Sequence, residues 1–475
     1  MSLRIYNTLS GQKEEFKPIN PGEVKMYVCG VTVYDRCHIG HARAGVVFDF
    51  VFRALRHLGY AVTYVRNFTD VDDKIINRAA ERGIPCDALV DENIAAFYED
   101  MDALHLLRPT HEPRATRYIA QMLAMIQTLI DKGMAYESGG DVFFAVSKFP
   151  EYGKLSKKNI DDLESGARVS VNESKHDPLD FALWKAAKPG EPKWASPWGE
   201  GRPGWHIECS AMGKDLLGDA FDIHGGGKDL VFPHHENEIA QSHGACGKPP
   251  VNYWMHNGFV NINKEKMSKS LGNFFTIREV LQKFDAEVIR LYLLGTHYRS
   301  PIDFADAYLV EARRHLDRLY ATADRAKQMI GARTNPAPLD IEKRLIAEIE
   351  DDFNSATVVA LLSEVAGRMN AEADLIDKKK GDVHGLAGLY GAFQTIGGLL
   401  GIFNHTPAEY LAEAKQKHLA EIGMSAAEVA ALITRRAEAR KAKNFAEADA
   451  IRKTLEEKGI EVKDSATGSW WSVNR

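Results

Sequence analysis

A stretch near the N-terminus, Tyr27 to His41 (YVCGVTVYDRCHIGH), constrains the fold of this chain more than any other. Residues 25–29 predict a short buried strand that ends at Gly30, and residues 42–58 repeat apolar side chains at helical spacing. The strand-to-helix turn therefore carries a thiol, Cys29, and a His-Ile-Gly-His sequence at the helix entrance. This end of a helix offers free N–H groups and the positive end of the helix dipole, and both favour an anion.

Two interpretations of the His-Ile-Gly-His sequence are open. In the first, the imidazoles of His38 and His41 donate hydrogen bonds to a phosphate that gains charge in a transition state, and Gly40 lets the backbone come close. In the second, the two histidines only cap the helix, since motifs this short also occur by chance.

The segment after this helix predicts the fold class. Residues 61–67 (AVTYVRN) are apolar and β-branched and lie at the distance of a next parallel strand, so we expect an α/β fold with a Rossmann-like, doubly wound sheet. Polar residues 68–74 (FTDVDDK) follow at the carboxyl edge of this strand, where such sheets bind ligands. Asp72 and Asp73 are interpreted as caps of the next helix.

Composition and periodicity divide the rest of the chain. A stretch rich in Gly, Pro and Trp is interpreted as an insertion, after which the sheet resumes with predicted strands at 204–209 and 221–224. Helices are predicted at 287–294, 305–330, 341–352, 356–377 and 386–403, which together favour a bundle. The expected parts are the first half of the Rossmann-like domain (1–119), the insertion (120–200), the second half (201–262), a loop and linking region (263–304), the helical bundle (305–404) and a small C-terminal α+β domain (405–475).

A helix that begins near Pro233 carries a candidate metal site. His234 and Glu238 are four residues apart, so both side chains face one side of the helix and could share a cation. With Cys29 and Cys209 they make two sulfurs, one nitrogen and one oxygen, which Zn²⁺ accepts. Alternatively, Cys209 is a small buried residue and Glu238 pairs with a lysine. The five cysteines are odd in number and far apart, which argues against a disulfide framework.

The segment from Lys264 to Ser270 (KEKMSKS) is a second candidate for phosphate binding. Lys266 and Lys269 are three residues apart, with Ser268 between them, and they predict a mobile cationic loop able to hold a polyphosphate. An ordinary solvated loop is the alternative. The His-Ile-Gly-His sequence upstream favours the phosphate interpretation.

Composition limits the kind of partner. The net charge of −6 provides no global basic field, so an RNA site would have to be a local patch. Residues 426–443 predict one such basic stripe, although a charged helical face without a ligand is the simpler alternative. The residues proposed for RNA contact are Arg435, Arg436, Arg440 and Lys441, with Trp470 as an aromatic partner.

The sequence also predicts a location in the cell. The N-terminus lacks a positively charged start followed by an apolar run, and no apolar stretch of about 18 residues occurs. We therefore expect a cytoplasmic protein without a membrane segment.

Two motifs together resemble those of class I aminoacyl-tRNA synthetases. Residues 38–41 (HIGH) and 266–270 (KMSKS) match the two signatures of that family without alteration. The resemblance narrows to the cysteinyl-tRNA synthetases and covers essentially the whole chain. The segments that carry it are 27–30 (YVCG), 180–185 (DFALWK), 202–210 (RPGWHIECS) and 232–238 (FPHHENE). Two features depart from the family pattern: Phe68, where an aliphatic residue is common, and the ending at 470–473, which is usually more basic.

The resemblance implies roles that spacing could not assign. It implies that Cys29, Cys209, His234 and Glu238 are the zinc ligands, with His234 chosen over His235. It implies an ATP site at His38, Gly40, His41, Lys266, Ser268 and Lys269, of which the histidines and lysines are catalytic. It implies a cysteine pocket of Gly30, Thr69 and Trp205, with His224 and Asp229 near this pocket or the adenosine.

The expected function is ATP-dependent activation of L-cysteine, assisted by Mg²⁺, followed by transfer of cysteine to the 3′ end of tRNA(Cys). One zinc per subunit would hold the substrate thiolate and select against serine, so no editing domain is expected, and the family suggests a monomer. The nearest alternative is a ligase that joins cysteine to an amino sugar in mycothiol-type biosynthesis. Such enzymes look truncated after the helical bundle, whereas residues 407–475 follow it here. A zinc-containing RNA-binding module without catalysis is a third hypothesis, and the intact motifs speak against it.

Overall fold

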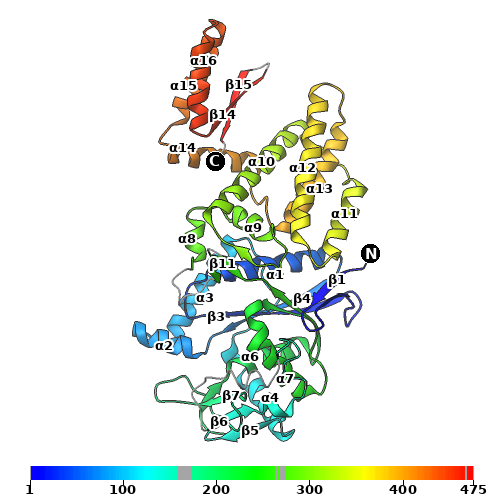
Figure 1. The fold of residues 1–475 in the computed structure, drawn as a ribbon, viewed down its shortest axis with the longest axis vertical. Helices are drawn as coiled ribbons and strands as arrows, with labels where there is room; N and C mark the ends of the chain where they lie inside the picture. The colour runs from blue at the N-terminus through cyan, green and yellow to red at the C-terminus, as the bar shows by residue number, and fades with distance from the viewer. Residues whose placement is uncertain (1, 159–173, 263–264, 267–273, 466–467, 474–475) are drawn as a thin grey trace. The chain divides into compact units, whose positions relative to one another are not determined.

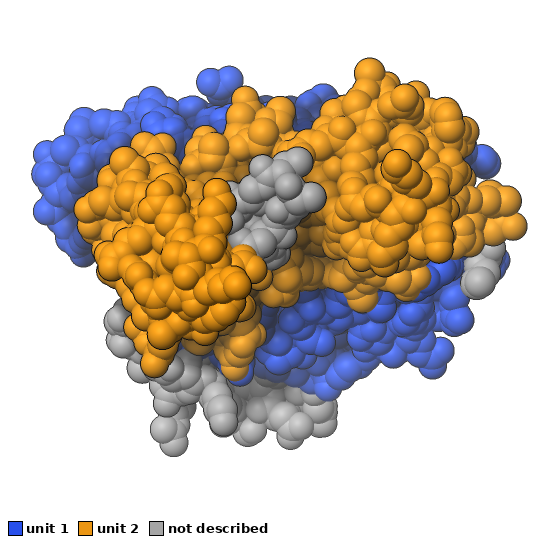
Figure 2. Space-filling model, turned by 90° about the horizontal axis from the view of Figure 1, so that it is seen from above, with its two compact units in different colours: residues 1–286, 293–304, 344–358 blue, residues 287–292, 305–343, 359–475 orange. Residues whose placement is uncertain are grey.

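The computed structural model describes residues 2–158, 174–262, 265–266, 274–465 and 468–473 (Figure 1). It divides into two compact units, which Figure 2 colours separately. Unit 1 comprises residues 1–286, 293–304 and 344–358, and unit 2 comprises residues 287–292, 305–343 and 359–475. Among the described residues, no helix is both long and apolar enough to cross a membrane.

A four-stranded parallel sheet organises unit 1. Its order is β10-β9-β3-β4, with β3 (Glu23–Thr32), β4 (Ala61–Thr69), β9 (Phe221–Gly227) and β10 (Val251–Asn257). The chain runs from β3 to one neighbour, β4, and later returns on the other side of β3 as β9. Ligands bind at such a reversal of strand order, beyond the carboxyl ends of the strands. The predicted doubly wound α/β fold is confirmed.

The central strand is longer than predicted. The predicted strand at 25–29 belongs to β3, which continues past Gly30 to Thr32 with a register shift against β4 between Val28 and Val31. A bulge of this kind lets a strand absorb an irregular residue and still resume pairing. The next helix, α1 (Ile39–His57), buries most of its apolar side chains, as the helical spacing predicted.

The predicted strand at 204–209 is wrong. Residues Trp205–Leu217 form helix α6, whose N-cap is Gly204 in an extended conformation. The alternation of Trp205, Ile207 and Cys209 imitated a strand, but residues 207–213 are all buried because α6 packs between neighbouring elements. Periodicity cannot separate a helix that is covered on all sides from a strand. The strand predicted at 221–224 is confirmed as part of β9.

The chain between β4 and β9 builds a second sheet in unit 1. Its four strands are antiparallel neighbours in sequence order, and their buried side chains share a hydrophobic core with α6. The elements are α2 (Asp73–Arg82), α3 (Cys86–Ala103), α4 (Ile119–Asp131), β5 (Ala135–Ser138), β6 (Asp141–Phe144), β7 (Phe181–Ala186) and β8 (Gly201–Pro203). Asp72 caps α2 by accepting from the Lys74 N–H at 2.9 Å, as predicted, whereas Asp73 pairs with Lys185 and Arg202.

Shorter elements complete unit 1. They are β1 (Arg4–Asn7), β2 (Gln12–Glu15), the π-helical turn η4 (Val231–His235), α7 (Glu236–Cys246), β11 (Val260–Ile262), β12 (Glu265–Lys266), α8 (Ile277–Leu281) and β13 (Ile302–Asp303). α6 and α7 pack against each other, so the segments that carry Cys209 and Glu238 lie side by side.

Long helices dominate the rest of the chain, close to the predicted ranges. They are α9 (Ala286–Leu294), α10 (Asp306–Ile330), α11 (Leu339–Glu350), α12 (Ser355–Asp377) and α13 (Val383–Leu400). The C-terminal elements are α14 (Pro407–Glu421), α15 (Ala426–Lys441), α16 (Phe445–Glu457) and the antiparallel pair β14 (Ile460–Ser465) and β15 (Gly468–Val473). The last three helices and these strands surround a small core of their own around Val429 and Leu455.

Candidate metal and nucleotide site

Six metal-ligating side chains gather at the carboxyl end of β3. We call them the donor cluster: Cys29 from β3, Cys209 from α6, His224 from β9, His234 and His235 from η4, and Glu238 from α7. All are buried except Cys29, which is half-buried. The cluster lies beside the reversal of strand order between β3 and β9, where an α/β sheet is expected to bind its ligand.

Four of these side chains form the ligand set that the sequence predicted. The sulfur atoms of Cys29 and Cys209 lie 3.7 Å apart, Cys29 Sγ lies 3.4 Å from Glu238 Oε1, and His234 Nε2 lies 3.0 Å from the same oxygen. Tetrahedral zinc, with bonds of about 2.0 Å to nitrogen or oxygen and about 2.3 Å to sulfur, separates its ligand atoms by about 3.3–3.8 Å. The four residues therefore fit a zinc ion with little movement.

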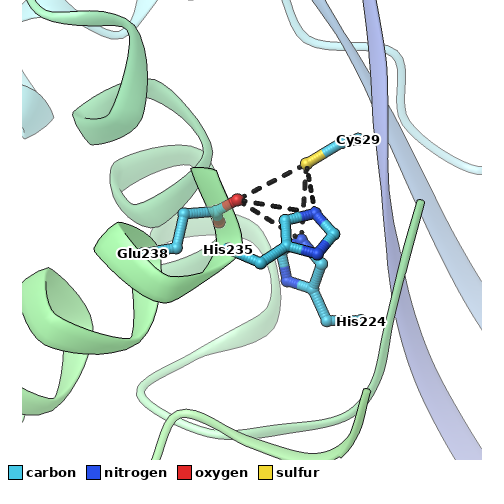
Figure 3. Close-up of side chains that lie close together, drawn as sticks. All are labelled: Cys29, His224, His235 and Glu238. Atoms are coloured by element: carbon cyan, nitrogen blue, oxygen red, sulfur yellow. Dashed lines mark hydrogen bonds and ion pairs between the residues drawn. The ribbon is translucent and has the colours of Figure 1, made fainter. Parts of the chain in front are cut away.

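A second combination of the same cluster meets the same distance limit. Cys29, His224, His235 and Glu238 also bring one ligand atom each to within 4.8 Å of the others, and Figure 3 shows these side chains converging. Geometry alone therefore does not choose between His234 and His235. The choice of His234 rests on the resemblance to the family.

Burial makes the donor cluster costly to charge without a cation. It raises the pKa values of the Cys29 thiol and the Glu238 carboxyl, and it lowers those of His224 and His235 well below the usual range. The hydrogen bond from Cys29 lowers the pKa of Cys209 to about 7. A divalent cation would reverse this balance, because buried anionic ligands are stable only when they are paired or coordinated.

The residues predicted to bind cysteine surround this cluster only in part. The Trp205 ring stacks on His234 with centroids 4.2 Å apart, and the Thr69 hydroxyl donates to Glu208 Oε2 at 2.7 Å. Trp205 thus contacts a member of the cluster, and Thr69 contacts the residue that precedes Cys209. Asp229 instead lies exposed in a turn after β9, so the structure does not draw it into the buried cluster.

Gly30 occupies a position that no other residue fits. Its N–H donates to Asn67 Oδ1 at 2.9 Å, and a Cβ added to it would lie 1.6 Å from the Asn67 carbonyl oxygen. Glycine is therefore required for the close approach of β3 and β4 next to Cys29.

The Gly30→Ala variant should be destabilised by about 3 kcal/mol or more, because either strand must move to relieve the clash. Urea unfolding measures this change. Gly213→Ala is the matched control, since a Cβ there meets only ordinary contacts of 3.5 Å or more inside helix α6. Equal stability of the two variants would contradict the prediction.

The His-Ile-Gly-His sequence forms the N-terminus of α1, as predicted. His38 Nδ1 accepts from the Gly40 N–H at 3.1 Å, His41 Nδ1 accepts from the His38 N–H at 3.2 Å, and the two rings stack 3.8 Å apart. The two histidines therefore cap the helix, and these caps do not exclude a phosphate-binding role. Because each Nδ1 accepts, each neutral ring carries its proton on Nε2, where it can serve as a donor.

The second predicted phosphate motif is described only at its start. The backbone of Lys266 belongs to β12 and pairs with Asn261 of β11. Ser268 and Lys269 lie outside the described residues.

Comparisons with known proteins decide the family. A model of the tRNA synthetases class I (C) catalytic domain matches residues 15–314, a DALR domain matches residues 344–404, and a cysteinyl-tRNA ligase anticodon binding domain matches residues 425–471. The cysteine–tRNA ligase of Syntrophotalea carbinolica is 55% identical over 483 residues, with 100% of both chains covered. The chain belongs to the cysteine–tRNA ligase family. It is therefore a class I aminoacyl-tRNA synthetase, as the motifs predicted.

Other members of the cysteine–tRNA ligase family are similarly close. The enzymes of Geobacter metallireducens and Acidovorax sp. (strain JS42) are each 54% identical, again with 100% of both chains covered. Among solved structures, Mycobacterium tuberculosis methionyl-tRNA synthetase with methionyl-adenylate has a TM-score of 0.57 at 15% identity, covering 86% of this chain and 95% of that one. The LeuRS of Agrobacterium radiobacter K84 has a TM-score of 0.58 at 12% identity, covering 83% and 87%. These two likenesses confirm the fold.

In this cysteine–tRNA ligase family member, the predicted basic stripe of α15 is only partly exposed. Arg440 and Lys441 are exposed, and so is Arg435, which pairs with Glu447 at 2.7 Å. Arg436 is buried at 6% exposure, so including it in a surface stripe was wrong: helical spacing turns it toward the small core. The side chain of Trp470 lies outside the described residues.

Sequence reasoning missed the residues that support the donor cluster from outside. His206 Nδ1 lies 3.0 Å from His234 Nδ1, and His256 Nε2 lies 2.7 Å from His235 Nδ1. Metal-bound histidines commonly use their second ring nitrogen in this way. Both residues lie far along the chain from their partners, so no local spacing could reveal them.

Proposed function

We propose that this protein activates L-cysteine with ATP and transfers it to the 3′ end of tRNA(Cys). One observation carries the proposal. The carboxyl end of β3 lies in a cluster of side chains that could hold a thiol-binding metal, and the next helix, α1, has two stacked histidines at its N-terminus. A site for a thiol and a site for a phosphate thus follow each other in one strand-to-helix unit. Membership of the cysteine–tRNA ligase family supports the same activity.

In the first step the carboxylate of cysteine attacks the α-phosphorus of ATP, and pyrophosphate leaves. The Nε2–H groups of His38 and His41 would stabilise charge on the phosphate oxygens, together with the helix N-terminus and the side chains of Lys266 and Lys269. Mg²⁺ would accompany the nucleotide, as in other phosphoryl and nucleotidyl reactions. The reaction needs no nucleophile from the protein.

In the second step a hydroxyl of the terminal tRNA ribose attacks the carbonyl carbon of the adenylate, and AMP leaves. Positioning dominates this step, because the adenylate is already activated. The α15–β15 region would hold the far end of the tRNA, since a cysteinyl-tRNA ligase anticodon binding domain matches it.

The donor cluster would provide selectivity. Cys29, Cys209, His234 and Glu238 would hold one Zn²⁺ per chain, and the bound metal would take the substrate sulfur as a thiolate in preference to a serine hydroxyl. A discrimination of about 10⁴ corresponds to about 5–6 kcal/mol of differential binding. Trp205 and Thr69 would then shape the pocket around the substrate, and Gly30 is proposed for the same pocket on family similarity. Asp229 is proposed for the same pocket on family similarity alone.

A ligase that joins cysteine to an amino sugar is the alternative function. It would share the metal site and the adenylation step but would need no anticodon-binding region. The match of residues 425–471 to a cysteinyl-tRNA ligase anticodon binding domain favours tRNA as the acceptor. We further propose that the protein acts as a monomer in the cytoplasm, which sedimentation of the purified protein and fractionation of cells would test.

Transfer of labelled cysteine to unfractionated tRNA tests the proposal directly. The purified chain is incubated with ATP and Mg²⁺, with serine as the control amino acid. The proposal is supported if tRNA is charged with cysteine and not with serine. Cysteine-dependent ATP–pyrophosphate exchange without charging would favour the amino-sugar ligase. The absence of both activities would favour the RNA-binding module.

The variant Arg440→Ala/Lys441→Ala should lower kcat/KM for tRNA by about tenfold and leave cysteine-dependent ATP–pyrophosphate exchange unchanged. Both side chains are exposed at the end of α15, where they can contact tRNA phosphates. Each lost phosphate contact lowers the affinity for tRNA and makes that affinity less dependent on salt concentration. Charging rates at several tRNA concentrations measure the effect. Lys17→Ala is the control, because this lysine is 76% exposed but lies in unit 1. An equal loss in both variants would point to a general charge effect.

A further inference from the structure

The donor cluster contains more ligands than one tetrahedral ion needs. We propose that it offers a cation a second position, formed by Cys29, His224, His235 and Glu238, which shares two ligands with the position assigned above. This inference goes beyond the proposed function, because charging requires only one of the two positions.

The distances around Cys29 support this second position. Cys29 Sγ lies 3.3 Å from His235 Nε2, 3.4 Å from His224 Nε2 and 3.4 Å from Glu238 Oε1 (Figure 3). Glu238 Oε1 in turn lies 3.6 Å from His224 Nε2 and 3.9 Å from His235 Nε2. Tetrahedral zinc sets edges of about 3.5 Å from sulfur to nitrogen or oxygen and of about 3.3 Å from nitrogen to oxygen. The three distances from Cys29 Sγ therefore fit closely, while those from Glu238 Oε1 to His224 and His235 must shorten by about 0.3 and 0.6 Å.

The surroundings of His235 provide an independent observation. Its Nε2 faces the cluster, while its Nδ1 lies 2.7 Å from His256 Nε2, and His256 Nδ1 lies 2.8 Å from the Thr8 hydroxyl. A partner on the second ring nitrogen orients the ring, and when Nδ1–H donates to that partner, Nε2 carries the lone pair, as is typical of metal-bound histidine. His235 is therefore oriented as a ligand no less firmly than His234, which has His206 as its partner.

His224 is held in a comparable way by packing. Its ring stacks on Trp254 with centroids 4.6 Å apart and lies 5.1 Å from the Tyr27 ring, and it is only 2% exposed. The ring thus keeps Nε2 directed at Cys29 before any ion arrives. Preformed ligands of this kind lower the cost of binding.

The two positions differ in chemistry. The first has two thiolates, one imidazole and one carboxylate, whereas the second has one thiolate, two imidazoles and one carboxylate. Both sets suit borderline cations such as Zn²⁺ and Co²⁺, but the second carries one negative charge less and should bind more weakly. Because Cys29 and Glu238 belong to both, an ion can change position by exchanging Cys209 and His234 for His224 and His235 without leaving the cluster.

Cobalt titration of the full-length chain tests the second position. In the variant Cys209→Ser/His234→Asn, which removes both ligands unique to the first position, we expect one Co²⁺ to bind about 10- to 100-fold more weakly than in the unmodified chain. The sulfur-to-cobalt absorption should fall to about half, because one of two thiolates remains. Adding His235→Asn should weaken binding by a further factor of about 100.

Matched variants make the result decisive. His243→Asn in the same background should leave cobalt binding unchanged, since His243 also lies on α7 but contacts Phe149 and Glu151. His224→Asn replaces His235→Asn if the latter fails to fold by circular dichroism. The proposal is overturned if Cys209→Ser/His234→Asn binds no Co²⁺ at millimolar concentration, or if removing His235 or His224 from it changes nothing.

Discussion

Replacing His38 with asparagine should lower the rate of cysteine-dependent ATP–pyrophosphate exchange by about 10²- to 10³-fold, the usual cost of losing one donor to a developing anion. The substitution separates two roles of the ring. Asparagine Oδ1 can replace Nδ1 as the acceptor for the Gly40 N–H, so the cap of α1 is kept, but nothing replaces the donor at Nε2. The thermal midpoint should therefore stay within a few degrees of that of the unmodified chain.

His38→Gln is the complementary control. Its amide nitrogen can reach the place of Nε2, while its oxygen cannot serve the short-range cap, so it should keep exchange within about tenfold and lose about 1 kcal/mol of stability. If the histidines served only as caps, the order would reverse, with asparagine fully active and glutamine impaired. Exchange kinetics and urea unfolding of the two variants decide between these results.

The sequence predicted those parts of the fold that depend on local pattern. The helices of unit 2 begin and end within a few residues of their predicted ranges, because apolar spacing and caps such as the Asp382 side chain are encoded nearby in the chain. The continuation of β3 beyond Gly30 was not predictable, since it depends on pairing with β4. The same holds for α6, whose burial on all sides removes the polar face that identifies a helix.

The sequence predicted one set of metal ligands but not the second pair of histidines beside it. Spacing and ligand chemistry proposed one set of His234, Glu238, Cys29 and Cys209, and the resemblance selected it. The structure brings all four side chains together. Neither route revealed His224 and His235 as a competing pair, because their convergence on Cys29 depends on how β9 and η4 pack against β3.

Removing the metal should cost the protein its preference for cysteine as well as its activity. We expect activation of cysteine to fall by about 10³-fold or more, and the preference over serine to fall from about 10⁴ to within about tenfold. A pocket shaped by side chains such as Trp205 and Thr69 cannot strongly distinguish a thiol from a hydroxyl of nearly the same shape. Thiolate ligation to a metal can, because sulfur is the far better ligand.

The measurement is ATP–pyrophosphate exchange with cysteine and with serine on protein as purified, protein stripped with a chelator, and stripped protein restored with zinc. The chelator is removed before the assay, so that Mg²⁺ remains available to ATP. A thermal melt of the stripped sample establishes that it is still folded, since metal binding and folding are linked. If stripped, folded protein kept its full preference for cysteine, selectivity would have to come from the pocket side chains, and the metal would be only structural. If zinc restores activity and preference together, the donor cluster recognises the substrate through its sulfur.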